Sequence, residues 1–84
     1  MAIIGAQSDP GIDLVPITPN DGLDLLRPAR AIRCRPDGTA GTLSIVTAEG
    51  NQRDTYINAG EALAVQVRRV RATGTSASGL EAYI

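Results

Sequence analysis

The stretch GEALAVQVRRVRATGTSASGLEAYI, residues 60–84, decides the fold of this chain. Within it, Leu63, Val65 and Val67 occupy every second position, which is the period of a β-strand with one buried face. The alternation slips at Arg68–Arg69, where a β-bulge would restore the register. The first half of the stretch therefore predicts one long strand with a bulge near its end.

The second half of the same stretch predicts a loop and a final strand. Residues 73–79 carry only small side chains, include two glycines and offer no apolar anchor. Beyond them Leu80, Ala82 and Ile84 alternate with polar or aromatic residues. We therefore expect the chain to end in a β-hairpin whose last residue is still in pattern.

Three further strands are predicted upstream, each with alternate side chains turned inward. Their spans and inward residues are 29–35 with Ile32 and Cys34, 42–47 with Leu43 and Ile45, and 52–58 with Thr55 and Ile57. Pro36-Asp37-Gly38-Thr39 is interpreted as a turn in which Gly38 has a positive φ, and Ala48-Glu49-Gly50-Asn51 and Ala59-Gly60 as further turns. Short turns and the absence of helical periodicity predict an all-β fold, a small antiparallel β-sandwich or barrel of about five to six strands.

Residues 1–28 differ from the rest in carrying four of the five prolines. Because proline lacks an N–H and fixes φ, this segment is predicted to be an extended N-terminal arm, with at most one helical turn capped by Asp21, while residues 29–84 form the β-sandwich or barrel body. Its aliphatic residues must be buried either on its own body or on a neighbouring subunit, and the pattern leaves both alternatives open.

The composition excludes most chemistry. The 84 residues include no His and no Lys, and one cysteine, Cys34, which is expected to be a buried, inert side chain. These absences remove the usual catalytic triads, zinc sets and an internal disulfide, so we expect no enzyme, no catalytic residue, no cofactor and no metal. A core built without Trp or Phe is small, and oligomerisation is the remaining way to stabilise it.

Location and charge limit the partners. No apolar run approaches the length of a membrane span and no signal peptide is apparent, so synthesis in the cytoplasm and no membrane partner are expected. The formal net charge of −1 disfavours binding to nucleic acid.

The arginines are the one constellation that has functional alternatives. They could pair with Glu61, Glu81 and Asp54, bind a subunit or partner protein, or bind phosphate. With three aliphatic residues of the arm, they make up the candidate oligomer or partner interface: Leu14, Val15, Ile17, Arg30, Arg33, Arg35, Arg68, Arg69 and Arg71.

Three motifs resemble one known family. Pro-Ile-Thr-Pro-Asn-Asp at 16–21, Pro-Ala-Arg-Ala-Ile at 28–32 and Val-Arg-Arg-Val-Arg-Ala-Thr-Gly-Thr at 67–75 look like the head-spike base proteins of gene transfer agents and related tailed phages. The resemblance implies a virion structural protein on the capsid exterior, a homo-oligomer at capsid vertices that anchors a spike fibre. It also implies partners: further copies of itself, as a pentamer at a vertex, the major capsid protein and the spike fibre protein. The alternative is a small β-barrel adaptor that binds protein or nucleic acid.

Overall fold

The computed structural model of the chain describes residues 11–84, and in this part it consists of strands and loops without a helix. The strands are β1 (Leu14–Pro16), β2 (Ala31–Thr39), β3 (Gly41–Thr47), β4 (Gln52–Ile57), β5 (Ala62–Leu63), β6 (Val67–Val70) and β7 (Ser78–Tyr83). The predicted all-β class is confirmed, with seven strands in place of the expected five to six.

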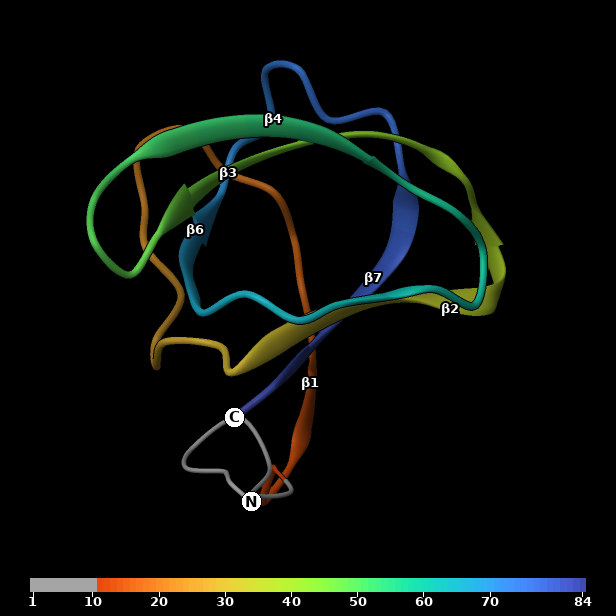
Figure 1. The fold of residues 1–84 in the computed structure, drawn as a ribbon, viewed down its shortest axis with the longest axis horizontal. Coiled ribbons are helices and arrows are strands. Elements are labelled where there is room, and N and C mark those ends of the chain that lie inside the picture. The colour runs from red at the N-terminus through yellow and green to blue at the C-terminus, as the bar shows by residue number, and fades with distance from the viewer. Residues whose placement is uncertain (1–10) are drawn as a thin grey trace.

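The strands form two antiparallel sheets that face each other as a sandwich (Figure 1). One sheet has four strands in the order β1-β7-β2-β5, and the other has three in the order β4-β3-β6. The chain crosses repeatedly between the sheets, so strands that are consecutive in the sequence are often not paired.

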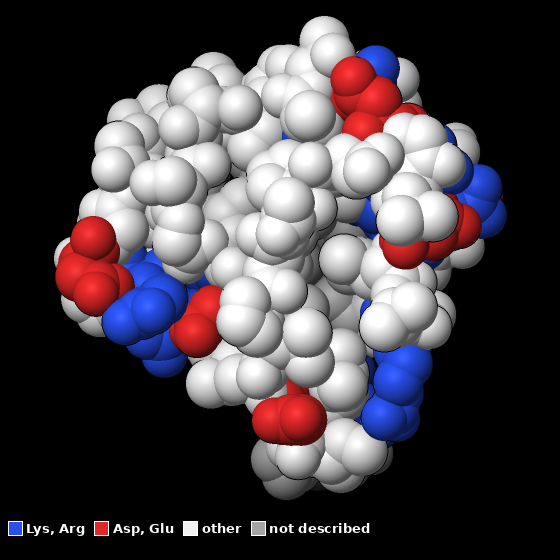
Figure 2. Space-filling view, turned by 180° about the vertical axis from the view of Figure 1, so that it is seen from behind, with Lys and Arg blue, Asp and Glu red and all other residues white. Residues whose placement is uncertain are grey.

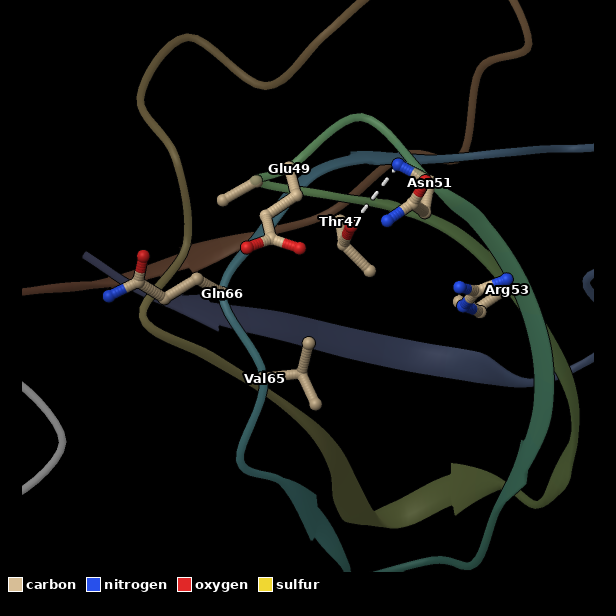
Figure 3. Close-up of a pocket in the computed structure, with 7 residues that line it drawn as sticks. Thr47, Glu49, Asn51, Arg53, Val65 and Gln66 are labelled. Atoms are coloured by element: carbon tan, nitrogen blue, oxygen red, sulfur yellow. Dashed lines mark hydrogen bonds between the residues drawn. The ribbon is translucent and has the colours of Figure 1, made fainter.

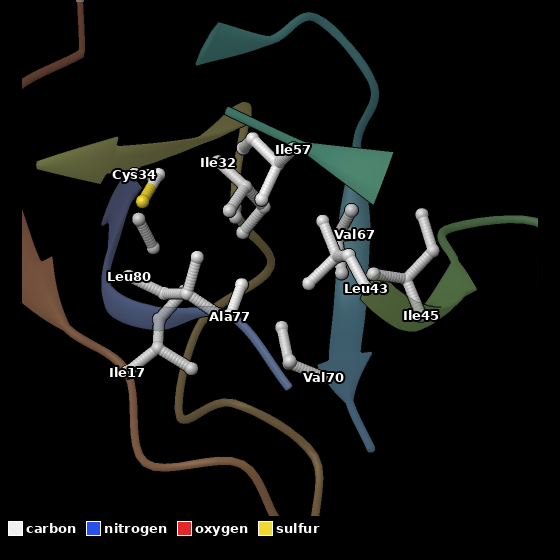
Figure 4. Packing of buried hydrophobic residues seen from close by; sticks show 12 residues of the cluster. Ile17, Ile32, Cys34, Leu43, Ile45, Ile57, Val67, Val70, Ala77 and Leu80 are labelled. Atoms are coloured by element: carbon white, nitrogen blue, oxygen red, sulfur yellow. The ribbon is translucent and has the colours of Figure 1, made fainter. Parts of the chain in front are cut away.

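One aliphatic core fills the space between the sheets (Figure 4). Ile32 and Cys34 of β2 are fully buried, as are Leu43 of β3 and Val67 of β6. Each of these side chains lies on the face that alternation predicted to be inward. Burial of a Leu, Ile or Val side chain contributes about 1.5 to 3 kcal/mol, which makes this cluster the main source of stability.

The predicted long strand is wrong, because residues 62–70 form two strands in different sheets. β5 pairs with β2, whereas β6 pairs with β3. Between them the N–H of Val65 donates to the carbonyl of Leu63 at 3.0 Å, a tight turn that redirects the chain. Leu63 and Val67 contact the core from opposite layers, as the alternation predicts, but Val65 between them is 37% exposed because it lies in the turn. The predicted bulge is confirmed: Val70 and Arg69 pair in register with β3, and the register then shifts by one residue at Arg68.

The predicted C-terminal hairpin is also wrong. β7 lies between β1 and β2 in the four-stranded sheet, and β6 is in the other sheet. The intervening loop runs beside β3, where the N–H of Ser76 donates to the carbonyl of Thr42 at 3.0 Å. Contrary to expectation the loop has an apolar anchor, because Ala77 is buried in the core.

The interpretation of residues 36–39 as a turn needs correction. β2 continues through them to Thr39, with a register shift against β7 between Cys34 and Thr39. Gly38 does not have a positive φ. Glycine is required at position 38 because β7 lies so close that a Cβ there would be 2.5 Å from the carbonyl oxygen of Ser78. The other two predicted turns are confirmed, with positive φ at Gly50 and Gly60.

The described part of the arm, residues 11–28, lies along both sheets. β1 is the edge strand beside β7, and Ile17 is buried in the core. Further on, the N–H groups of Asn20 and Leu25 donate to carbonyls of β6 at 2.9 and 2.8 Å. The helical turn considered after Asp21 does not form, because residues 21–27 have only bends. Residues 1–10 of the predicted arm lie outside the described residues, and the division of the chain at residue 28 stays a prediction.

Candidate interaction surface

Two arginines of β2 pair with carboxylates on the same sheet. The Nε of Arg33 lies 3.3 Å from Oε1 of Glu81, its register partner on β7. The Nη2 of Arg35 lies 3.0 Å from Oδ2 of Asp37. Of the three carboxylates considered as arginine partners, only Glu81 has this role. Asp54 accepts a hydrogen bond from the Ser44 hydroxyl instead.

The third of those carboxylates, Glu61, accepts a hydrogen bond from the backbone N–H of Asn58 at 2.8 Å. Glu61 thus holds the turn before β5 rather than an arginine. The pairing expected from the sequence is correct in kind, but two of its three acidic partners are used for local hydrogen bonds.

Two further arginines tie the arm to β6 and the loop that follows it. The Nε of Arg69 lies 2.8 Å from Oδ1 of Asp24, and its Nη1 donates to the carbonyl of Asp21 at 3.2 Å. The Nε of Arg71 lies 3.9 Å from Oδ1 of Asp21. Because these pairs are partly solvated, their main effect is to set where the arm lies.

Asp21 also anchors the loop after β6. Its carboxylate accepts hydrogen bonds from the Thr73 hydroxyl at 2.6 Å and from the Thr73 N–H at 2.9 Å. The hydrogen bond from the Thr73 hydroxyl is the main reason that the pKa of Asp21 is lowered, and the nearby Arg71 adds to the effect. The carboxylate that was considered as a helix cap therefore connects two segments that are distant in the sequence.

The charged side chains do not form a field of one sign. On the face seen in Figure 2 acidic and basic groups lie next to each other at the rim, and the centre of the face is uncharged. Four arginines, Arg33, Arg35, Arg69 and Arg71, are each within 4.0 Å of a carboxylate. This arrangement lacks the continuous basic surface that binding to a phosphate backbone requires.

A cleft of about 320 Å³ opens at the side of the sandwich, between β4 and the connection from β5 to β6 (Figure 3). Arg53 of β4 and Val65 of the connection lie on opposite sides of it, and the turn after β3 contributes Glu49. Thr55, predicted to face the core, is exposed on this strand, because the four-stranded sheet does not cover this end of β4. The cleft is lined by a cation, Arg53, a carboxylate, Glu49, and an aliphatic side chain, Val65.

Several aliphatic side chains of the arm are exposed on a part of the fold separate from the cleft. Leu14 and Val15 of β1 are 43% and 37% exposed, and Leu26 is fully exposed. Ile12 and Leu23 are also exposed. Contiguous patches of such groups, rather than single exposed side chains, mark surfaces that bind other proteins.

The predicted interface residues do not form one patch. Leu14 and Val15 lie on β1, and Arg33 and Arg35 lie on β2, with β7 between the two strands. The others are Ile17 in the core, Arg30 exposed before β2, Arg68 and Arg69 on β6, and Arg71 just after it.

The cleft has one sign in the sequence, the polar residues at inward positions of β4. Arg53 and Thr55 share the inward phase of β4 with Ile57, the one core residue of that strand. Polar residues in the inward phase indicate that the opposite sheet does not cover that part of a strand.

Among residues 11–84 there is no group of three potential metal ligands and no helix long and apolar enough to cross a membrane.

No protein-family model matches the chain, and no curated protein does either. A solved structure does: a chain of the structure described as the capsid of a native GTA particle computed with C5 symmetry. The two chains are 36% identical and superpose with a TM-score of 0.80, over 93% of this chain and 88% of that one. This match places the chain in the class of structural proteins of phage-like particles. Within that class, it belongs to the family of gene transfer agent (GTA) particle proteins.

Proposed function

We propose that the chain is the head-spike base of a gene transfer agent or a related tailed phage, a homo-oligomer at capsid vertices that anchors a spike fibre. The observation that carries the proposal is the match over most of both chains to a chain of a GTA capsid. That capsid was computed with C5 symmetry, and the vertices of a capsid lie on fivefold axes. The proposed oligomer is therefore a pentamer on the capsid exterior, with the major capsid protein and the fibre protein as partners.

The surface of the molecule supports an assembly role. Leu14 and Val15 expose aliphatic groups on an edge strand, and Arg30 and Arg68 have no carboxylate within 4.0 Å among residues 11–84. We assign these four members of the predicted interface to contacts with other particle proteins. Arg33, Arg35, Arg69 and Arg71 are already paired within the subunit, and Ile17 is buried, so they position these contacts.

The test is to compare particles from a strain that lacks the gene with particles from the same strain complemented by the wild-type chain. We expect the deletion to remove density at the capsid vertices in electron cryomicroscopy and to remove the fibre protein from purified particles. Complementation with Leu14→Asp should restore less of both than complementation with Leu14→Ile. Unchanged vertex density and fibre content in the deletion strain would overturn the proposal.

A further inference from the structure

β4 is an edge strand whose outer side pairs with no other strand among residues 11–84, and the Gln52 carbonyl on that side accepts a hydrogen bond from Nη1 of Arg53 at 3.5 Å. Thr42 and Ser44, which lie opposite Tyr56 and Asp54 in the register, use their backbone N–H groups for Ser76 and Thr75 on the other side of β3. In an antiparallel ladder, opposite residues that do not bond to each other both point away from the pair. The N–H and C=O groups of Asp54 and Tyr56, and of Gln52 two residues earlier, therefore point out of the sheet.

The edge of β6 is closed by the arm. The N–H of Asn20 donates to the carbonyl of Val70 and that of Leu25 to the carbonyl of Arg68. Ala29 forms an isolated bridge with Val67. No outward carbonyl of β6 is left for another strand.

The two edges of the four-stranded sheet are blunted as well. On β1, Pro16 has no N–H, and the outward N–H of Leu14 donates to Oδ1 of Asp13 at 2.8 Å. At the other edge, β5 has two residues. Soluble proteins usually protect edge strands by such means, because an open edge pairs with other chains. Among residues 11–84, β4 is the one long edge that no other segment of the chain covers, and its charged residues Arg53 and Asp54 are the features that limit pairing there.

A symmetric partner does not suit this edge. Pairing β4 with β4 of a second copy about a twofold axis centred on residue 53 or 54 opposes Arg53 to Arg53 or Asp54 to Asp54, and like charges directly opposite each other are destabilising, whereas an axis centred on residue 55 avoids this repulsion. A twofold contact also closes at two subunits, whereas a ring requires two different surfaces on each subunit. The strand that covers β4 is therefore a different segment.

We propose that residues 2–8 of one copy pair with the free edge of β4 in the next copy of the ring. This inference rests on the proposed oligomer and names its contact. The segment, Ala-Ile-Ile-Gly-Ala-Gln-Ser, has no charge and no proline, and its two β-branched residues favour a strand. Asp9, which follows the segment, is negatively charged. Arg53 has no carboxylate within 4.0 Å among residues 11–84, so Asp9 of the neighbouring copy could pair with it.

The cleft beside β4 explains the two isoleucines of the segment. Consecutive side chains of a strand point to opposite faces, so one of Ile3 and Ile4 faces the cleft next to Val65 and the other faces the side of Tyr56. Tyr56 is 56% exposed in the single subunit and Val65 is 37% exposed. The bound segment thus covers apolar surface on both faces of β4.

The segment reaches a neighbour rather than its own β4. Figure 1 places β1 and the C-terminus at the opposite end of the molecule from β4, and the N–H of Ile12 donates to the carbonyl of Ile84 at 2.6 Å, so the described chain begins at that end. If residues 2–8 are paired, only Asp9 and Pro10 remain as the connection, and they span about 7 Å. The donor at one end and the acceptor at the other end are the two different surfaces that a ring requires.

The inference is tested with a donor variant and an acceptor variant of the full chain. Ile3→Asp with Ile4→Asp disables the donor, and Ile3→Val with Ile4→Val is its control. Gln52→Pro disables the acceptor, because it removes the outward N–H of the first residue of β4, and this N–H makes no hydrogen bond to β3. Gln52→Ala is its control. Light scattering should show a closed oligomer for wild type and both controls, and association weaker by roughly tenfold or more for each disabled variant.

The decisive measurement mixes the two disabled variants. The donor variant retains an open β4 and the acceptor variant retains an intact residue 2–8 segment, so the mixture should form a one-to-one pair although each alone is monomeric. A ring that persists in both variants, or a mixture that stays monomeric, overturns the inference. If Gln52→Pro lowers the unfolding midpoint, Tyr56→Pro replaces it, since the N–H of Tyr56 also points outward. Particle incorporation of the wild type is a separate readout, so failure of this contact is distinguishable from failure of the spike-base proposal.

Discussion

Gly38 lies where β2 is in close contact with β7, and substitutions there distinguish close packing from a turn. A Cβ at this position would be 2.5 Å from the carbonyl oxygen of Ser78, about 0.9 Å short of the 3.4 Å at which ordinary contact begins. It would also meet the carbonyl of Arg35 at 3.1 Å and the sulfur of Cys34 at 3.2 Å. Since two of these atoms are backbone, Gly38→Ala should cost about 2 to 3 kcal/mol, the upper range for overpacking.

A larger side chain at the same position should cost more. Gly38→Asn should therefore be less stable than Gly38→Ala. Gly60 gives the matched control, because it has a φ of +84° and no atom within 4 Å of a built Cβ. There Gly60→Ala should cost about 1 to 2 kcal/mol through backbone strain alone, and Gly60→Asn less, since Asn tolerates positive φ.

The assay is urea unfolding followed by far-UV circular dichroism, because the chain has two tyrosines and no tryptophan. With a urea m-value of about 1 kcal/mol/M for a chain of this size, Gly38→Ala should lower the midpoint by about 2 M. The order of the two substitutions should reverse between the two glycines. If Asn is better tolerated than Ala at Gly38, residue 38 is in a turn and the close approach of β2 and β7 is refuted.

Three other perturbations test separate parts of the structure. Asp21→Asn should make the free energy of unfolding depend less on pH at the acid end. The pKa of Asp21 in the folded chain lies below the ordinary 3.8, so the stabilisation by Thr73 is complete above pH 3.8 and is lost as the pH falls through the folded pKa. Urea midpoints measured between about pH 2 and 6 would show this difference. Leu43→Ala, at a fully buried site, should cost about 2 to 5 kcal/mol, whereas Val65→Ala in the cleft should cost less than 1, and equal losses would contradict the core assignment. The buried Cys34 thiol should react with an aromatic disulfide reagent no faster than the chain unfolds, and rapid labelling of the folded protein would show that it is accessible.

Local alternation predicted the core well but not the connections. Ile32, Cys34, Leu43 and Val67 are buried as their positions within each strand indicate, because side-chain period is a local property of the backbone. The same period cannot tell a continuous strand from two strands that enter opposite sheets in the same inward phase. Residues 62–70 therefore have the pattern of one strand although they form two, β5 and β6.

Hydrogen bonds between distant segments are the part that no sequence pattern contains. The Pro36–Thr39 motif has the composition of a turn, yet contact with Ser78 keeps it in β2. Asp21 has the composition of a helix cap, yet it binds Thr73, 52 residues later. Residue type states what each group can bond to, and the fold decides which partner is present.

The arm shows how this small sandwich assigns its edges. Its described part is hydrogen bonded to both sheets, with the N–H of Ile17 on Leu80 of β7 and the N–H of Leu25 on Arg68 of β6. The arm therefore closes the edge of β6, and with Pro16 and Asp13 it also blunts its own edge at β1. These edges are thus sealed from within the subunit, while the outer side of β4 pairs with no other strand among residues 11–84. A subunit with one sealed and one open edge pairs in a single direction, which is the property that a closed ring needs.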